Sequence, residues 1–155
     1  MKLNIPAYKE LQINKLVFDY NGTLACDGQS NKKIKEILND LAMDFEVYIL
    51  TADTFGTVKE EFDDTEIEIV IIDSEAGASF KKKFIEQLEA SEVIAIGNGN
   101  NDALMLKEAA LGILVLGAEG AASKALLNSD LVVRSIENCL EILQQPKRLI
   151  ASLRC

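Results

Sequence analysis

The residues best suited to chemistry stand in three short polar segments, each after an apolar run, and at one lysine. Asp19-Tyr20-Asn21-Gly22-Thr23 follows one run, Thr51-Ala52 follows another, and Gly97-Asn98-Gly99-Asn100-Asn101-Asp102 follows a third. Lys81 lies near the start of a predicted helix that precedes the last of these segments. A carboxylate at the end of a rigid strand can attack phosphorus and form an acyl phosphate. Glycine-rich backbone, a threonine hydroxyl and a lysine can each hold a phosphoryl oxygen, so the set favours phosphoryl transfer.

The same segments offer oxygen ligands for a divalent cation. Mg²⁺ prefers oxygen ligands from few carboxylates, and Asp19 and Asp102 could supply them. The chain contains no histidine, which excludes Ser-His-Asp and Cys-His catalysis and histidine-bound zinc. Its three cysteines, Cys26, Cys139 and Cys155, are widely spaced, as expected of free thiols in a reducing compartment.

These segments need a scaffold that brings them together, and the sequence predicts an alternation of strands and helices. The strands are short apolar runs rather than alternating patterns, which is typical of parallel strands buried on both faces. We therefore expect an α/β fold with a doubly wound, Rossmann-like parallel sheet in three layers. In such folds the ligand lies beyond the carboxyl ends of the strands. The predicted strands are residues 15–19, 46–50, 66–72, 93–96, 112–116 and 130–133, and the predicted helices are residues 30–43, 54–62, 79–90, 101–110, 121–127 and 136–144.

The flanking segments complete one predicted domain over residues 1–155. Residues 1–14 read as an N-terminal strand pair around a turn at Pro6-Ala7-Tyr8, residues 15–144 as the core, and residues 145–155 as a C-terminal tail that follows the break at Pro146. Ser30 is the expected N-cap of the first core helix.

Length and charge exclude several other classes of protein. With 155 residues and 48% hydrophobic residues, the chain can bury one core. A net charge of -9 without a basic stripe disfavours nucleic acid and anionic lipid as partners. The apolar runs are too short to span a bilayer, and the N-terminus lacks a signal-peptide core. We expect a cytoplasmic protein.

Taken together, these motifs resemble those of a known family, the haloacid dehalogenase-like (HAD) superfamily. Its first motif, D-x-D-x-T, corresponds to residues 19–23, its Thr or Ser motif to Thr51, its lysine motif to Lys81, and its G-D-G-x-N-D motif to residues 97–102. The stretch KKKFIEQL…EVIAIGNGNNDALMLKEAALGILVLG is particularly similar to P-type ATPases. The chain is most similar to the small soluble P-type ATPase-like phosphatases.

The resemblance implies a role for each matching residue and Mg²⁺ as cofactor. Asp19 would be the phosphorylated nucleophile, with Thr51 and Lys81 as the other catalytic residues. The phosphoryl group would be bound by Gly22, Thr23, Thr51, Ala52 and Lys81. The metal would be held by Asp19, the backbone carbonyl of Asn21, Asn98 and Asp102, the last completing or orienting the shell.

Two departures from the family pattern bear on turnover. Asn21 replaces the aspartate that serves as general acid and base, and an amide can do neither. Asn98 replaces an aspartate that usually binds Mg²⁺, so weaker metal binding is expected. Two functions stay open: a slow Mg²⁺-dependent phosphohydrolase acting through aspartyl phosphate, or a degenerate domain that binds phosphate or a partner without turnover. A receiver-like phosphoacceptor is disfavoured, because the candidate nucleophile ends the first core strand and precedes Gly-Thr.

Some assignments stay open at this level. Lys82 and Lys83 compete with Lys81, while Asp53 and Asp73 read as loop residues. Only residues 25–29 separate the first motif from the next helix, so the chain is predicted to lack a cap domain. Without a lid, water must be excluded by a partner subunit or a bulky phosphorylated substrate. We therefore expect a homo-oligomer or a phosphorylated substrate, small or macromolecular, that covers the site itself.

Overall fold

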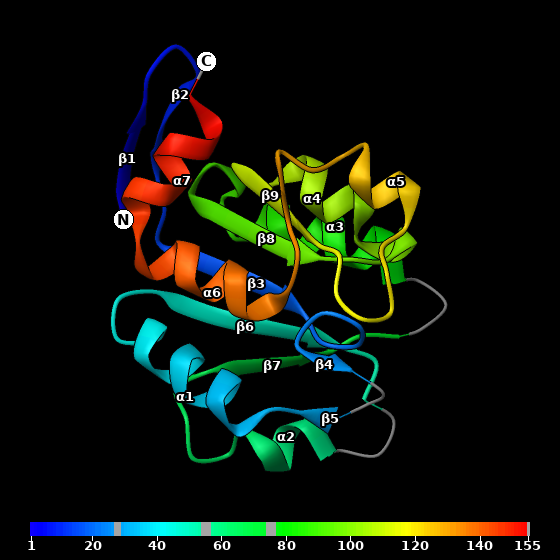
Figure 1. Cartoon of the computed structure of the whole chain (residues 1–155). Helices are drawn as coiled ribbons and strands as arrows, with labels where there is room; N and C mark the ends of the chain where they lie inside the picture. Colours follow the sequence, from blue (N-terminus) through cyan, green and yellow to red (C-terminus); the bar gives the residue numbers. More distant parts are fainter. Residues whose placement is uncertain (27–28, 54–56, 74–76, 155) are drawn as a thin grey trace.

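A six-stranded parallel sheet with the order β10-β9-β8-β3-β6-β7 forms the centre of the molecule (Figure 1). This computed structural model describes residues 1–26, 29–53, 57–73 and 77–154. The strands are β1 (Lys2–Ile5), β2 (Lys9–Gln12), β3 (Lys15–Asp19), β4 (Ala25–Cys26), β5 (Gln29–Ser30), β6 (Glu46–Thr51), β7 (Glu68–Ile71), β8 (Val93–Gly97), β9 (Leu111–Val115) and β10 (Leu131–Val133). The helices are α1 (Lys32–Leu41), α2 (Thr57–Glu61), α3 (Gly77–Gln87), α4 (Ala103–Glu108), α5 (Ser123–Leu126), α6 (Ile136–Gln144) and α7 (Pro146–Leu153), with 3-10 turns η2 (Ala90–Glu92) and η3 (Asn100–Asp102).

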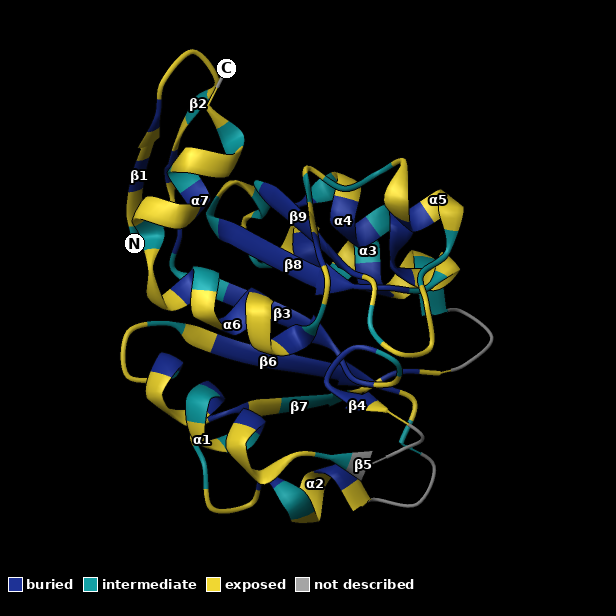
Figure 2. Cartoon of the chain, in the orientation of Figure 1, coloured by how far each residue is buried: buried dark blue, intermediate teal, exposed yellow. Residues whose placement is uncertain are grey.

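Helices cover both faces of the sheet and make three layers, which confirms the predicted fold class. Successive side chains of a strand point to opposite faces. Leu16 and Phe18 of β3 therefore join a core formed with α1 and α6, while Val17 joins a second core formed with α3 and α4. Figure 2 shows the central strands buried and the outer surfaces of the helices exposed. Burial on both faces explains the continuous apolar runs in the sequence.

The order of the strands places two polar segments side by side. From β3 the chain moves outward through β6 to β7, and then returns to β8 on the other side of β3. Parallel pairing of β3 with β8 sets Phe18 opposite Ile96, so Asp19 and Gly97 end neighbouring strands. The direction of winding reverses between these strands, and ligands of open α/β sheets bind at such a point.

The N-terminal segment has the structure that the sequence predicts, and the C-terminal segment does not. The expected N-terminal strand pair is confirmed, because β1 and β2 pair antiparallel around residues 6–8. The expected C-terminal tail is wrong: residues 146–153 form helix α7, with Leu149 fully buried in the core. Pro146 does end α6, but it also starts α7, since proline at the first helical position loses no hydrogen bond.

The segment before α1 also departs from expectation. Ser30 was the expected N-cap, but it lies in strand β5, which pairs with β4, and its hydroxyl donates to Glu61. Asn31 caps the helix instead, and its side chain accepts from the backbone N–H of Lys33 at 3.0 Å. In the described part of this segment, the paired strands β4 and β5 lie between the first motif and α1, where a cap domain would otherwise be inserted.

Other helix boundaries shift by a few residues. Helix α3 ends at Gln87 rather than Ala90, because Glu89 adopts a left-handed backbone with φ of 63°. The predicted helix over residues 54–62 is α2, and residues 54–56 lie outside the described ranges.

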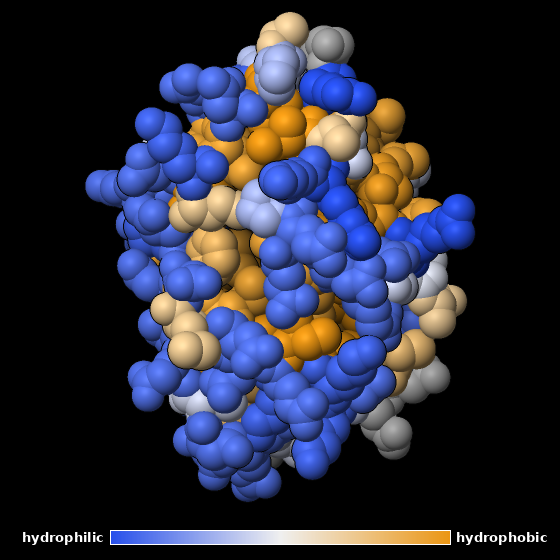
Figure 3. All heavy atoms as spheres, turned by 60° about the vertical axis from the view of Figure 1, so that its left-hand side comes forward, coloured by the Kyte–Doolittle hydropathy of each residue, from blue (hydrophilic) through white to orange (hydrophobic). Residues whose placement is uncertain are grey.

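One face of the molecule shows how polar and apolar side chains are distributed on its surface. Figure 3 shows a face on which hydrophilic side chains cover most of the area and hydrophobic ones gather in smaller patches between them. Within the described ranges, no helix is both long enough and apolar enough to cross a membrane.

Candidate active site

A buried lysine joins two carboxylates at the carboxyl edge of the sheet. The Lys81 Nζ lies 2.5 Å from Asp19 Oδ1 and 2.6 Å from Asp102 Oδ1. Lys81 and Asp102 have no exposed surface, and Asp19 is 6% exposed. Charges removed from water in this way are stable only when they are paired. The three residues therefore form one ionic cluster, which we call the lysine cluster.

Three separate elements position this cluster. Asp19 ends β3, the strand between β6 and β8, and Asp102 closes the turn η3 just after β8. Lys81 lies on the buried side of α3, together with Ile85. Its neighbours point outward: Lys82 pairs with Glu86 and Glu108 at the surface, and Lys83 is exposed. Of the three candidate lysines, the fold thus places Lys81 beside Asp19.

Burial and neighbouring charges both shift the pKa values of Asp19 and Lys81. Burial and the neighbouring Asp102 carboxylate raise the pKa of Asp19 to about 7, although Lys81 and Thr23 act against them. Burial also opposes the charge on Lys81, but Asp19 and Asp102 outweigh it and raise the pKa of Lys81 above its usual value. Lys81 is therefore a permanent cation that holds the two carboxyl groups together.

Asp102 also organises the loop that follows β8. Its Oδ2 accepts from the backbone N–H groups of Asn98 at 2.9 Å and Gly99 at 2.8 Å. Both of its oxygens are therefore engaged, one by Lys81 and one by this loop. This geometry suits the orienting role expected of Asp102 rather than direct binding of a metal.

On the other side of Asp19 the polar groups are amides and a hydroxyl. The Thr23 hydroxyl lies 3.2 Å from Asp19 Oδ2 and 3.2 Å from Asn98 Oδ1. Asn98 Nδ2 donates to the carbonyl of Gly120 at 3.2 Å. We call Asn21, Asn98 and Thr23 the amide side of the site. Gly22 carries the turn between them, with φ of 77° in the region that favours glycine.

This geometry fits an added cation. A hydroxyl has a single proton, so Thr23 can donate to only one of its two oxygen neighbours at a time. The Asp19 and Asn98 oxygens beside this hydroxyl therefore share one hydrogen-bond donor. Oxygen atoms in such a set are the ligands that Mg²⁺ prefers. The backbone carbonyl of Asn21 is the third expected ligand. In the described part of the chain, no three His, Cys, Asp or Glu side chains come together as a metal site.

The Thr51 side chain is the clearest gap in the hydrogen bonding of the site. Thr51 is 2% exposed, and within the described ranges its Oγ1 has no hydrogen-bond partner. A buried hydroxyl without a partner costs about 1–3 kcal/mol. Such a cost at the end of β6, next to β3, is what a binding site for an oxygen-rich ligand would carry.

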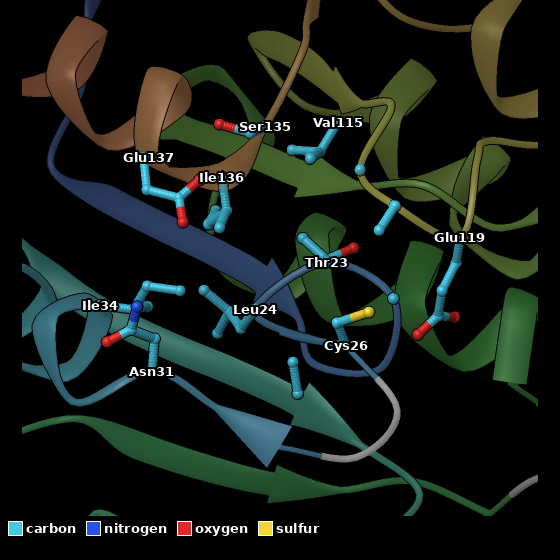
Figure 4. A pocket seen from close by; sticks show the side chains of 14 residues that line it. Thr23, Leu24, Cys26, Asn31, Ile34, Val115, Glu119, Ser135, Ile136 and Glu137 are labelled. Carbon is cyan, nitrogen blue, oxygen red and sulfur yellow. The ribbon is translucent and has the colours of Figure 1, made fainter.

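A cavity of about 340 Å³ opens beside these groups. Of the expected site residues, Asp19, Asn21, Ala52, Lys81 and Asn98 line it. Thr51 and Asp102 are buried residues that do not appear in its lining. Gly22 and Thr23, expected to bind phosphate, line an adjoining cavity of about 270 Å³ instead (Figure 4). Thr23 reaches the site only through its bonds to Asp19 and Asn98.

Sequence reasoning missed part of the lining. Asp73 and Asn101 both line the cavity that contains Asp19. Asp73 comes shortly after β7, so the rule that ligands lie beyond strand ends could have selected it. Asp53, by contrast, accepts from the backbone N–H of Val58 at 2.8 Å and has the structural role expected of a loop residue.

About half of the chain is similar in sequence to a known archaeal protein. No family model matches the chain. Over 78 residues the chain is 50% identical to the uncharacterized protein MJ0073 of Methanocaldococcus jannaschii, a match that covers 48% of this chain and 84% of that protein.

Solved structures give the fold. A 3-deoxy-D-manno-octulosonate 8-phosphate phosphatase from Moraxella catarrhalis, in complex with magnesium, phosphate and KDO, matches with a TM-score of 0.65 and 18% identity over 92% of this chain and 94% of that one. A Legionella pneumophila protein described as a HAD superfamily (subfamily III A) hydrolase matches with a TM-score of 0.64 and 17% identity over 90% and 87%.

The P-type ATPase resemblance also has a structural counterpart. The catalytic domain of the CPx-ATPase CopB-B matches with a TM-score of 0.60 and 22% identity, over 76% of this chain and 46% of that one. The chain thus has the HAD-like fold of these structures, and by its identity to MJ0073 it belongs to the same protein family as that archaeal relative.

Proposed function

We propose that this protein is a Mg²⁺-dependent phosphohydrolase in which Asp19 attacks phosphorus and is transiently phosphorylated. The observation that carries the proposal is the lysine cluster at the cavity. A carboxylate that lines the cavity stands 2.5 Å from a buried ammonium group, which can hold both the nucleophile and the charge of an incoming phosphoryl group.

In the first step an Asp19 oxygen forms a bond to phosphorus, and the bond to the leaving-group oxygen breaks. The leaving oxygen keeps the electron pair. In the second step water attacks the aspartyl phosphate, which releases inorganic phosphate and restores the Asp19 carboxylate. Lys81 stays protonated throughout and faces the phosphoryl oxygens. The Thr51 hydroxyl gains in a phosphoryl oxygen the acceptor that it lacks among the described residues.

Magnesium held by Asp19, the Asn21 carbonyl and Asn98 would supply positive charge to the phosphoryl oxygens. The side chain of Asn21 can neither protonate the leaving group nor activate water, so both steps are slow. Substrates whose leaving groups are stable anions, such as acyl phosphates, should therefore react faster than alkyl phosphates. This preference gives the first choice of test substrate.

Partners and location belong to the same proposal. The substrate is a phosphorylated molecule, small or macromolecular, and the open cavity is closed either by that molecule or by a second copy of the chain. The widely spaced cysteines support a cytoplasmic location, and the net charge of -9 without a basic stripe supports a protein that does not bind nucleic acid.

The test is chemical trapping of the intermediate. Fresh protein is incubated with acetyl phosphate and Mg²⁺, quenched in acid and digested, and the peptides are examined by mass spectrometry. We expect one hydroxylamine-sensitive phosphoryl group on the peptide that contains Asp19, together with slow release of phosphate. The matched control, Asp19→Asn, keeps the shape of the side chain but has no nucleophile, so both signals should vanish.

Each alternative outcome is informative. A labelled Asp19 without phosphate release would indicate a phosphoacceptor whose aspartyl phosphate is not hydrolysed. The absence of both the label and the phosphate release would overturn the proposal. Intact mass must be checked beforehand, because Asn21-Gly22 and Asn98-Gly99 are prone to deamidation, which would restore aspartate at either position.

A further inference from the structure

The loop between β9 and α5 brings a carboxylate close to Asn98. A side-chain Cβ at Gly22 would lie 2.6 Å from Asn98 Nδ2 and 3.1 Å from Glu119 Oε2, so the two side chains surround the same point. Figure 4 shows Glu119 extending from this loop beside the turn that carries Thr23. The loop is also tied to Asn98 through its backbone, because the Ala122 N–H donates to the Asn98 carbonyl at 2.8 Å.

This surrounding gives the Asn98 amide a preferred orientation. Its nitrogen donates to the Gly120 carbonyl at 3.2 Å. The point where a Cβ of residue 22 would lie is 3.1 Å from Glu119 Oε2, and it is nearer to the Asn98 nitrogen, at 2.6 Å, than to the Asn98 oxygen, at 3.2 Å. The Asn98 oxygen faces the Thr23 hydroxyl, which also lies beside Asp19. A flipped amide would place its oxygen against a carbonyl and a carboxylate, which is electrostatically unfavourable. The loop therefore directs the Asn98 oxygen toward Asp19.

The same surroundings disfavour an aspartate at position 98. A carboxylate there would bring an oxygen against the Gly120 carbonyl, where an N–H donor now lies, and would add a second negative charge near Glu119. The family resemblance predicts a carboxylate at position 98. In this chain position 98 is an asparagine, and a carboxylate lies nearby at position 119. Glu119 lines the adjoining cavity rather than the one with Asp19, so its influence passes through Asn98.

We propose that Glu119 is a positioning residue for the phosphoryl site: with Gly120, it keeps the Asn98 oxygen turned toward Asp19 and makes asparagine, not aspartate, the residue that fits position 98. This inference rests on the proposed function in so far as the oxygen serves a bound cation. The pairing of positions 98 and 119 itself needs no catalysis, and so it can be tested separately.

The experiment is a double-mutant cycle of Asn98→Asp, Glu119→Gln and the combined variant. The readout is the unfolding equilibrium constant of the ligand-free protein, obtained by urea unfolding. We expect Asn98→Asp to raise this constant in the native background and to raise it about tenfold less in the Glu119→Gln background, because one of the two neighbouring carboxylates is then absent. Glu137→Gln removes another carboxylate from the same cavity lining and should give no such coupling.

Three further outcomes decide between explanations. The coupling should shrink in high salt, because Glu119 is exposed and its field is screened. Changes in the unfolding equilibrium constant that multiply independently within about twofold would overturn the inference. Absence of thermal stabilisation of the native protein by Mg²⁺ and beryllofluoride, a mimic of an aspartate-bound phosphoryl group, would overturn the proposed function. The pairing of positions 98 and 119 is decided by the cycle alone.

Discussion

Asp19 lies between two regions of contrasting chemistry. On one side Lys81 and Asp102 are fully buried and charged, and each charge has a partner within 2.6 Å. On the other side Asn98 is 9% exposed and uncharged, and its side chain makes single hydrogen bonds of 3.2 Å to Thr23 and Gly120. The lysine cluster is complete in the ligand-free protein, whereas the amide side has oxygens in excess of protons. We infer that the first contributes to stability and the second to ligand binding.

The largest effect should come from removing the cation of the lysine cluster. Lys81→Met leaves two buried carboxyl groups beside each other without a counter-charge, and loss of one member of a buried ionic group costs about 3–5 kcal/mol. Urea unfolding of the ligand-free protein measures this cost. Lys83→Met, on the same helix but exposed, should change the free energy of unfolding by less than about 0.5 kcal/mol. Similar losses in both variants would show that the lysine cluster contributes no more to stability than an exposed lysine.

The second effect is a dependence of stability on pH. Because the folded-state pKa of Asp19, about 7, lies above its ordinary value of 3.8, the folded protein favours the protonated carboxyl. This contribution is complete below about pH 4 and is lost as the pH rises through about 7. No histidine titrates in this range, so few other groups interfere. The unfolding free energy should fall from pH 5 to pH 7, and Asp19→Asn should flatten that slope; an unchanged slope in the variant would contradict the assignment.

A smaller effect is expected on the amide side. Asn98→Ala removes neutral hydrogen bonds to Thr23 and Gly120, and we expect a loss of about 1–2 kcal/mol in the free energy of unfolding. Stabilisation by Mg²⁺ with beryllofluoride should be lost to a larger extent. Thermal unfolding with and without these ligands separates the two quantities. If the variant were as unstable as Lys81→Met, the amide side would also be part of the structural core.

The smallest effect should have the opposite sign. Thr51→Val replaces a buried hydroxyl that lacks a partner among the described residues by a methyl group of similar size. The ligand-free protein should gain up to about 1 kcal/mol, since a cost of desolvation is removed. Binding of Mg²⁺ with beryllofluoride should weaken at the same time. A loss of stability without a change in binding would show that the hydroxyl is structural.

The contrast between the two sides also explains how far the sequence could predict the site. Asp19, Lys81 and Asp102 belong to motifs with characteristic spacing, and β3 was predicted with its observed bounds because a continuous apolar run ends at an acid. Glu119 follows no such motif. Its place beside Asn98 depends on how the loop after β9 folds back over Gly22, which no local pattern encodes.

Local patterns fail elsewhere for related reasons. The two-residue strands β4 and β5 are too short to show a periodicity, so Ser30 was assigned to the helix that follows. Pro146 marks both the end of one helix and the start of another, and only packing of Leu149 distinguishes these cases. The order of the strands depends on long-range pairing, so the position of β3 between β6 and β8 emerged only from the structure.

The lysine cluster has a consequence for the kinetics of folding. Lys81 is 62 residues from Asp19 and 21 residues from Asp102, so the cluster assembles only after β3, α3 and η3 have docked. Stripping water from any one of these charges before the others arrive is unfavourable. We therefore expect the cluster to form after the folding transition state, with φ-values near zero. It would then govern how slowly the native protein unfolds, and leave the rate at which it folds nearly unchanged.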